Sequence, residues 1–273
     1  AEAEADARKA LLAVLGGQGK YHPNTPKYIT TLAAILLEQG RYAETEKLTR
    51  AALDILRTVG VAEDSPAMAG TLSDLGNILT LQRKDSEAIE TYAQLERVVA
   101  KWEPNRREAL LLSGSRIVAL YAANRIDAGI AAAEALIKRQ LSRVGEGHYD
   151  TASARGTLAI GSAKAGRSAE AIREFKLAVP PMIAAARENS EDDDSAAVAA
   201  RSQMLQTIVE AYIGVLAHDA NRSAQAAVET FALADAVRGR SVQQALAASS
   251  ARMIAKDPAL AELWGVGQDH GVV

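Results

Sequence analysis

Internal repetition limits how this chain of 273 residues can fold more than any other feature of its sequence. Residues that favour helix N-caps, Thr25, Ser65 and Asn105, stand before three apolar runs at intervals of 40 residues. Asp150 precedes a fourth run 45 residues later. Proline follows both Thr25 and Ser65, and proline is tolerated in the first turn of a helix. Helix starts that recur at a nearly fixed interval indicate an array of repeated units.

A second set of landmarks recurs with nearly the same period. Short breaks begin at Gln39, Arg83, Asn124 and Gly166, and a second amphipathic run follows each of them. A small residue stands soon after each break, and another residue on the same helix face follows one turn later. The small residues after the four breaks are Thr45, Ala88, Gly129 and Ala171, and a fifth unit fits at Ala227, 56 residues after Ala171. The residues one turn later are Thr49, Tyr92, Ala133, Phe175 and Phe231. Because small residues let two antiparallel helices cross closely, each unit is predicted to be a helix–turn–helix of about 42 residues.

The composition favours helices throughout the chain. Alanine, the best helix former, occurs 57 times, and aromatic residues make up only 4% of the sequence. Apolar residues recur at helical spacings on the first run of the units. They are Leu32, Leu36, Leu75, Leu79, Ile117, Leu120 and Leu158. A single helix pair can bury such a stripe only against its neighbours, so we predict an all-α solenoid of about five helix pairs.

Several classes of protein are excluded or disfavoured. Cysteine is absent, which excludes disulfide bonds, thiolate metal sites and a cysteine nucleophile within this sequence. A net charge of −3 without a cluster of Lys or Arg argues against a nucleic-acid surface. The longest apolar stretch, residues 109–123, contains Arg116 and is too short to span a membrane. The N-terminus shows no signal peptide and no initiator methionine, so it is a processed end or an artificial boundary, and we expect a cytoplasmic location.

The repeated segments resemble the tetratricopeptide repeat (TPR), in its long form of about 42 residues per unit, as in kinesin-light-chain-like arrays. The resemblance covers about residues 8–240 and implies a right-handed superhelix of about five TPR-like helix pairs with partial capping helices. It also implies that the first helix of each pair lines a concave groove for a peptide or partner protein. The matching segments are residues 28–44, 51–53, 75–77, 86–88 and 166–171, with the linkers 19–25 and 145–151.

A narrower resemblance lies near the C-terminus. Residues 230–241 and 244–246 look like the helix that closes the repeat array in bacterial TPR proteins with a CHAT domain, which has a caspase-like protease fold. Residues 257–263 are similar to the segment that leads toward that domain. In that family a His/Cys pair carries out proteolysis, and neither the domain nor any cysteine is present in this sequence. The resemblance implies a regulatory or sensing region whose partner is an attached or separate caspase-like domain.

These landmarks set the expected domain organisation. We expect a partial repeat or N-terminal capping helix in residues 1–20, a TPR superhelix in 21–240, a C-terminal capping or linker helix in 241–264, and a disordered tail in 265–273. The five repeats are expected at about 25–60, 65–101, 105–145, 150–189 and 195–240.

Residues that could carry chemistry have simpler explanations. His22 and His148 occupy equivalent linker positions, which favours a turn-stabilising role over metal binding or catalysis. The acidic run 191–194 lacks the alternating oxygens and the distal Glu of a calcium loop, and acidic residues before a helix are explained by its dipole. Ser113 lies in a helical pattern rather than in a strand–turn–helix elbow. Residues 16–20 lack the spacing of a phosphate-binding loop, so we predict no catalytic, cofactor-binding or metal-binding residue.

The remaining candidate site is the surface of the first helices that would line the groove. Its residues are expected one turn apart, on the side away from the partner helix. They are Thr30, Ala34 and Leu37; Ser73, Asn77 and Thr80; Gly114, Val118 and Tyr121; Gly156, Ile160 and Ala163; and Tyr212 with Leu216. Such a groove would be neutral and mildly apolar, with Asn77, Tyr121 and Tyr212 as hydrogen-bonding anchors, and would suit an extended or helical segment rather than a carboxylate clamp. Alternatively, these residues pack on one another or on an attached domain.

The sequence favours a non-catalytic scaffold that binds a peptide or partner protein in this groove, as the regulatory part of a larger CHAT protein. The alternative is a self-assembly module that brings effector domains together. An enzyme is disfavoured because no acid, base and nucleophile converge in the sequence. A nucleic-acid-binding repeat is disfavoured because such modules use shorter units and a basic groove.

Overall fold

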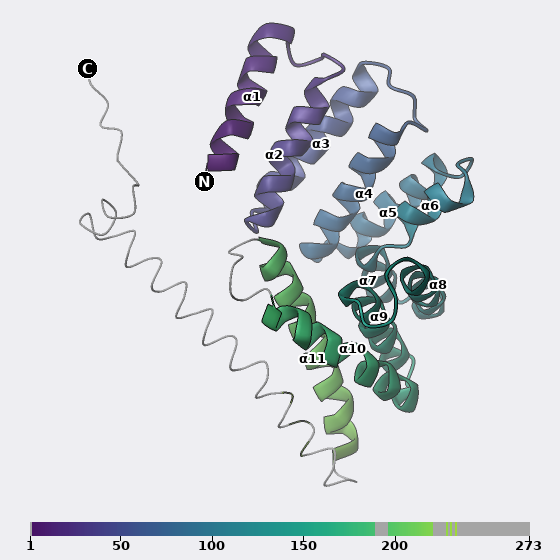
Figure 1. Cartoon of the computed structure of the whole chain (residues 1–273). Helices are drawn as coiled ribbons and strands as arrows, with labels where there is room; N and C mark the ends of the chain where they lie inside the picture. The colour runs from purple at the N-terminus through teal and green to yellow at the C-terminus, as the bar shows by residue number, and fades with distance from the viewer. Residues whose placement is uncertain (1, 189–195, 221–227, 229, 231–232, 234–273) are drawn as a thin grey trace, which may run out of the picture. The chain divides into compact units, whose positions relative to one another are not determined.

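The computed structural model describes residues 2–188 and 196–220, together with Val228, Thr230 and Leu233. This described part of the chain contains eleven α-helices and no strand, which confirms the predicted all-α class (Figure 1). The chain divides into two compact units, residues 1–212 and 213–273, and the boundary between them falls within the last helix.

The first unit is a succession of helix pairs joined by short turns. The helices are α1 (Glu2–Gln18), α2 (Thr25–Glu38), α3 (Tyr42–Thr58), α4 (Pro66–Leu81), α5 (Asp85–Val98), α6 (Pro104–Leu111), α7 (Gly114–Ala122), α8 (Ile126–Val144), α9 (Tyr149–Lys164), α10 (Ser168–Glu188) and α11 (Ala196–Ala220). The pairs are α2 with α3, α4 with α5, α7 with α8, and α9 with α10. The second helices of the first three pairs also pack on the next first helix, α3 on α4, α5 on α7 and α8 on α9, so the core is continuous from one pair to the next.

The turn inside each pair has the same geometry in all four repeats. A residue in the left-handed conformation stands at Gly40, Arg83, Asn124 and Gly166, with φ of 72°, 60°, 59° and 74°. The residue after it donates its backbone N–H to the carbonyl five residues earlier, as Arg41 does to Leu36 at 2.9 Å. This is the hydrogen-bond pattern of a Schellman motif, which ends a helix. The four breaks predicted from the sequence are these four turns.

Helix starts agree with the predicted caps at one position and differ at three. The Ser65 hydroxyl accepts a hydrogen bond from the backbone N–H of Met68 at 3.2 Å, which is the predicted N-cap of α4. Helix α2 already includes Thr25, α6 begins one residue before Asn105, and α9 begins one residue before Asp150. The three differ because other residues begin these helices. A proline stands in the first turn of α2 and of α6, and His148 caps α9.

Two of the linkers between repeats are built identically. Thr25 donates its hydroxyl proton to the Gly19 carbonyl at 3.0 Å, and Thr151 does so to the Gly145 carbonyl at 2.7 Å. In each linker the histidine Nδ1 accepts a hydrogen bond from the backbone N–H two residues later, at 3.2 Å for His22 and 3.1 Å for His148. The two histidines therefore stabilise turns, as their equivalent positions predicted.

The first helix of the third repeat is broken. The sequence pattern around Ser113 is helical, and in the structure residues 112–113 separate α6 from α7. The Ser113 hydroxyl accepts from the backbone N–H of Arg116 at 3.3 Å and so caps α7. A new N-cap inside an apolar run ends the first segment, because a serine side chain competes for the backbone donors of a helix.

The small residues predicted to lie at the helix crossings of the first four repeats are buried. Thr45, Ala88 and Ala171 have at most 1% of their surface exposed, and Gly129 is buried as well. The residues one turn later, Thr49, Tyr92, Ala133 and Phe175, are buried as well. The predicted crossings of the first four repeats are therefore confirmed.

Some expectations fall on residues that lie outside the described part of the chain. They concern Ala227 and Phe231 of the fifth repeat, the acidic run 191–194, the segment 257–263, and the ranges 241–264 and 265–273. Of the segment that resembles a closing helix, Thr230 and Leu233 are described; both are helical, and Leu233 is buried.

Candidate partner-binding surface

One exposed stripe follows helix α4. Gly70, Asp74, Asn77 and Leu81 are separated by four, three and four residues, so they lie on one face of the helix. The other side of α4 is buried against α3, α5 and α7. Packing therefore leaves Asp74 and Leu81 exposed on this face, and Gly70 and Asn77 partly exposed.

Helix α7 extends the stripe into the third repeat. Ser115 and Val118 are partly exposed and Ala122 is exposed, again at helical spacing. The Ser115 hydroxyl donates a hydrogen bond to Oδ1 of Asn77 at 2.6 Å, so the two stripes lie side by side. We define the first-helix face by these residues of α4 and α7. They are Gly70, Asp74, Asn77, Leu81, Ser115, Val118 and Ala122.

Asp74 is the charged group of this face. Its side chain is exposed, and among the described residues it has neither an ion pair nor a hydrogen bond. Although water reaches the carboxylate, the protein around it displaces much of its hydration, and this desolvation raises the pKa of Asp74 above its usual value. A carboxylate that is partly desolvated and unpaired would gain from the approach of a cation.

Asn77 and Leu81 give the face two further kinds of group. Because Oδ1 of Asn77 accepts from Ser115, the side-chain N–H groups of Asn77 are oriented to donate elsewhere, and no described residue accepts from them. Leu81 is 44% exposed, which is high for a large apolar side chain in a helix that is otherwise well packed. An anion, an amide donor and an apolar side chain therefore succeed one another along α4.

The exposed side of α2 is more polar. Lys27, Thr31, Ala34 and Glu38 follow one another there at helical spacing. The Thr31 hydroxyl bonds to the Lys27 carbonyl within the helix at 2.9 Å. The stripe therefore has a positive charge, Lys27, at one end and a negative charge, Glu38, at the other. The predicted groove contained no charged residue on this helix.

Some predicted groove residues lie on the exposed faces, as Ala34, Asn77 and Val118 do, and others lie one position away from them. Ala34 is exposed, and Thr30, Leu37, Ser73, Asn77, Gly114, Val118, Ile160 and Ala163 are partly exposed. Thr80, Tyr121, Gly156, Tyr212 and Leu216 are buried, so their assignment to an open groove is wrong for the described conformation. One residue of a helix turns the side chain by about 100°, which moves Thr80 and Tyr121 into the core and brings Leu81 and Ala122 to the surface.

Tyr121 is buried between glycines of two helices. A Cβ atom on Gly129 of α8 would lie 2.6 Å from its Cδ1, and one on Gly161 of α9 would lie 2.7 Å from its Cε1. The Tyr121 hydroxyl has no hydrogen-bond partner in the described structure, and burial raises its pKa strongly. Tyr121 is therefore a packing residue at the junction of the third and fourth repeats.

Tyr212 and Gly156 are likewise occupied by packing. Tyr212 is 2% exposed and stacks on Phe175 of α10, with ring centroids 4.8 Å apart and an interplanar angle of 21°. A Cβ on Gly156 would lie 2.9 Å from Cγ1 of Ile208, so α11 closes over α9 at this point. The predicted hydrogen-bonding anchors are reduced to Asn77.

Sequence reasoning missed Asp74 and Leu81, although a signal for both was present. The buried stripe of α4 includes Leu72, Leu75 and Leu79, and the residue that follows Leu75 is Gly76, which a close crossing requires. Placing Leu75 and Gly76 at the centre of the buried side puts Asp74 and Leu81 on the opposite one.

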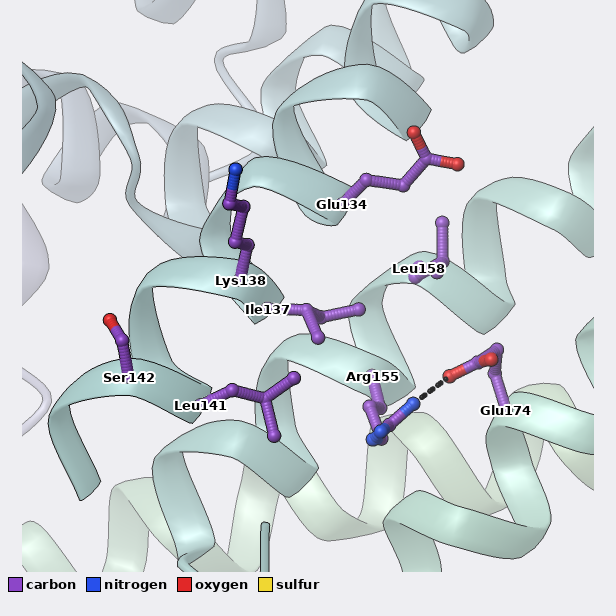
Figure 2. Close-up of a pocket in the computed structure, with 8 residues that line it drawn as sticks. All are labelled: Glu134, Ile137, Lys138, Leu141, Ser142, Arg155, Leu158 and Glu174. Carbon is purple, nitrogen blue, oxygen red and sulfur yellow. Dashed lines mark hydrogen bonds and ion pairs between the residues drawn. The ribbon is translucent and has the colours of Figure 1, made fainter. Parts of the chain in front are cut away.

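A second concave feature, which was not expected from the sequence, lies between α8, α9 and α10. It has a volume of about 570 Å³. Figure 2 shows Ile137 and Leu141 of α8 pointing toward Leu158 and Arg155 of α9. Arg155 is paired with Glu174 at 2.9 Å, and its Nε is buried without an acceptor in the described structure.

The charges of this pocket are balanced. Two cations, Lys138 and Arg155, line it together with two carboxylates, Glu134 and Glu174. Arg155 is also held by Glu146 at 3.1 Å, so its guanidinium is already engaged on two sides. The pocket therefore offers an apolar floor but no net charge that would select a ligand.

The described residues contain neither a metal-binding cluster nor a membrane-spanning helix. None of their His, Asp and Glu side chains gather in groups of three or more that could hold a metal ion. Of the helices described, none is both long and apolar enough to cross a membrane.

Comparison with known proteins places the fold. No family model and no curated protein matches the chain. Among solved structures, it is similar to a kinesin light chain-like protein of Podosopora anserina with nearly identical TPR-like repeats. That match has 16% identity and a TM-score of 0.52, and it covers 70% of this chain and 89% of the other. BtubC (BKLC) from P. vanneervenii matches with 16% identity and a TM-score of 0.53, covering 91% of this chain and 89% of its own.

At such low identity these matches speak for the fold alone. The described helix pairs, their Schellman turns and their close crossings agree with it. The chain is an α-solenoid of TPR-like repeats, the fold that these solved structures share.

Proposed function

We propose that the protein is a non-catalytic interaction scaffold that binds a peptide or an extended segment of a partner protein on the first-helix face. TPR-like repeat folds generally mediate protein–protein interaction. One observation carries the choice of this face: Asn77 and Leu81 are accessible one turn apart on α4, although the packing of the repeats does not require either to be exposed. The hydrogen bond from Ser115 to Asn77 joins this part of the face to the next repeat.

The surface has the properties of a peptide-binding face rather than of an active site. Its polar groups are an amide, a hydroxyl and one carboxylate, and the Ser115 hydroxyl donates to the Asn77 amide oxygen rather than to a catalytic base. Exposed amide donors can pair with the backbone of an extended chain, and an exposed leucine can receive an apolar side chain. Generic ester and peptide substrates are accordingly expected to show no turnover.

The test is selection of peptides from a random phage-displayed library on the full chain, followed by affinity measurement with the selected peptide in fluorescence anisotropy. The double variant Asn77→Ala with Leu81→Ser should weaken binding at least tenfold, because it removes both the amide and the apolar contact. Tyr121 is left unchanged in this design, since its truncation would open the core between two repeats.

A matched control is Leu177→Ser on α10, because Leu177 is 47% exposed, close to the exposure of Leu81, and lies on a second helix. This variant should bind the selected peptide as the unchanged chain does. Selection of no peptide, or equal binding by the double variant, would refute the assignment of the function to this face.

The larger context is a further part of the proposal. Resemblance of residues 230–241, 244–246 and 257–263 to the end of the repeat array in TPR–CHAT proteins supports a regulatory role beside a caspase-like domain. Reading the coding sequence beyond Val273 tests it. A following domain with a His/Cys pair would support regulation of proteolysis, and a stop codon would leave a free-standing adaptor.

Self-assembly is the second candidate function, and helix α1 favours it. Leu11 packs against the cluster of Ile29 and Ile55, whereas Leu12 is 68% exposed. An apolar side chain on the outer side of a terminal repeat helix can bury itself against a second copy. Light scattering should then show a mass that rises with concentration and falls to the monomer in Leu12→Glu. A monomer at all concentrations would remove this candidate.

A further inference from the structure

We propose that the first-helix face selects peptides in which Lys or Arg stands three residues from a large apolar residue, with Asp74 pairing with the cation and Leu81 receiving the apolar side chain. This inference rests on the proposed function and names the chemistry of its partner. It follows from three groups on one face of α4 and from the separation between them.

Asp74 supplies the preference for a cation. The carboxylate has no ion pair among the described residues, and desolvation by the surrounding protein raises its pKa. A Lys or Arg side chain would replace the lost hydration with a charge-assisted hydrogen bond. An acidic residue at the same point would meet a like charge, which disfavours acidic peptides.

The cations nearest to this face in the sequence are paired with other carboxylates. Arg83 lies 3.7 Å from Asp85, and Lys84 lies 2.7 Å from Glu46. Arg116 of α7 is ion-paired with Glu96 and also donates to the Leu111 carbonyl at 3.3 Å. Lys27 stands in the first turn of α2, a different first helix. The carboxylate of Asp74 is therefore available to a cation supplied by a partner.

The spacing along α4 sets the spacing in the peptide. Asp74 and Leu81 are seven residues apart, which corresponds to about 10 Å along a helix axis. Three residues of an extended polyproline II segment span about 9 Å and bring side chains back to the same side of the chain. A basic residue and an apolar residue three positions apart therefore match the two groups.

Asn77 lies between these two groups and gives the contact to the peptide backbone. Its Oδ1 is engaged by Ser115 at 2.6 Å, which orients the side-chain N–H donors of Asn77 away from that bond. A backbone carbonyl between the basic and the apolar residue of the peptide would accept from them. This contact is independent of sequence, so it contributes affinity, while Asp74 and Leu81 contribute selectivity.

The experiment compares peptides selected from the same random library by the full chain and by its Asp74→Asn variant. Peptides enriched on the unchanged chain should carry Lys or Arg three positions from Leu, Ile, Met or Phe. Asn is nearly isosteric with Asp, so the variant should fold and still select peptides, but without the basic residue. Affinity for the selected basic peptide should fall at least fivefold in Asp74→Asn.

Charge exchange sharpens the test. Asp74→Lys should prefer a synthetic peptide in which Glu replaces the selected basic residue, and should bind the original peptide least. A control is Glu90→Gln on α5 of the same repeat, because Glu90 is an exposed carboxylate without an ion pair among the described residues and lies off the first-helix face. This control should bind both peptides as the unchanged chain does.

The outcomes separate this inference from the proposed function. If enriched peptides lose binding in the Asn77→Ala with Leu81→Ser variant but show no basic residue, or if Asp74→Asn binds them unchanged, the function stands and the charge selection is wrong. If no peptide is enriched on the unchanged chain, both are wrong.

Discussion

The ring of Tyr121 fills the space that a side chain on Gly129 would occupy, with a Cβ at Gly129 only 2.6 Å from its Cδ1. In the preceding repeat the roles of the two helices are reversed. The ring of Tyr92 comes from the second helix and presses on Gly76 of the first, where a Cβ would lie 2.7 Å from Cε1. The second and third repeats thus each fill their crossing with one tyrosine and one glycine, but the tyrosine comes from the second helix in one and from the first helix in the other.

The hydroxyl groups of these two tyrosines should respond differently to removal. Tyr121→Phe removes a buried hydroxyl without a partner in the described structure, so it should leave stability unchanged or raise it by up to about 1 kcal/mol. Tyr92→Phe should cost about 1 kcal/mol, because the Tyr92 hydroxyl is hydrogen-bonded to Thr80 and Ser113. Urea denaturation of both variants measures the difference. A loss of stability in Tyr121→Phe as large as that in Tyr92→Phe would contradict the absence of a hydrogen-bond partner for the Tyr121 hydroxyl.

Glycine substitutions should separate crossings from open positions. Gly129→Ala should cost about 1–3 kcal/mol, because the added methyl group meets the buried Tyr121 ring and forces a shift of packed atoms. Gly70→Ala provides the control, since nothing lies within 4 Å of a Cβ there and alanine favours helix formation. It should stabilise α4 by about 0.5–1 kcal/mol. Thermal denaturation followed by circular dichroism should give shifts of opposite sign.

The turns inside the repeats offer a third comparison. Arg83 and Asn124 hold the left-handed conformation at positions where the first and fourth repeats have glycine. Arg83→Gly should stabilise the chain by about 1 kcal/mol, because an ordinary side chain is strained in this conformation. Asn124→Gly should gain less, since asparagine tolerates the left-handed region. If chemical denaturation shows that Arg83→Gly and Asn124→Gly gain the same stability, strain of the side chain in the left-handed conformation is not the cause of the stabilisation.

The periodic features of the fold, its turns, its helix crossings and its helical class, could be predicted from the sequence because each recurs at several positions along the chain. Four breaks, four buried small residues and the all-α class agree with the structure. A helix start could not be placed as well, because the Thr25 hydroxyl bonds back to the Gly19 carbonyl, and His148 rather than Asp150 caps α9. Each of these depends on one side chain and its immediate partners.

The candidate surface was harder to predict because a shift of one residue exchanges inside and outside. Tyr121 shows why. Its exposure depends on the side-chain volume that the facing helix supplies, and not on the pattern of its own helix alone. In the third repeat the positions of Ala88 and Tyr92 are taken by Gly129 and Ala133, so the second helix loses volume there. A close-packed core must recover that volume, and Tyr121 supplies it from the first helix. Comparing volumes between repeats would have placed Tyr121 in the core.

Asp74 should reduce stability at neutral pH, and Asp74→Asn should remove that effect. Its pKa is raised by desolvation, so the folded state binds a proton more readily than the unfolded chain, whose pKa lies near the usual 3.8. The carboxylate therefore destabilises the fold above the raised folded-state pKa, and the effect disappears as pH falls below about 3.8. Because Asp74 is exposed and screened by water, the melting temperature of Asp74→Asn should exceed that of the unchanged chain by only about 1 °C at pH 7. The two should melt together at pH 3, and Glu90→Gln should show no such gain at either pH. A lower melting temperature for Asp74→Asn at pH 7 would mean that the carboxylate has a stabilising partner within the chain.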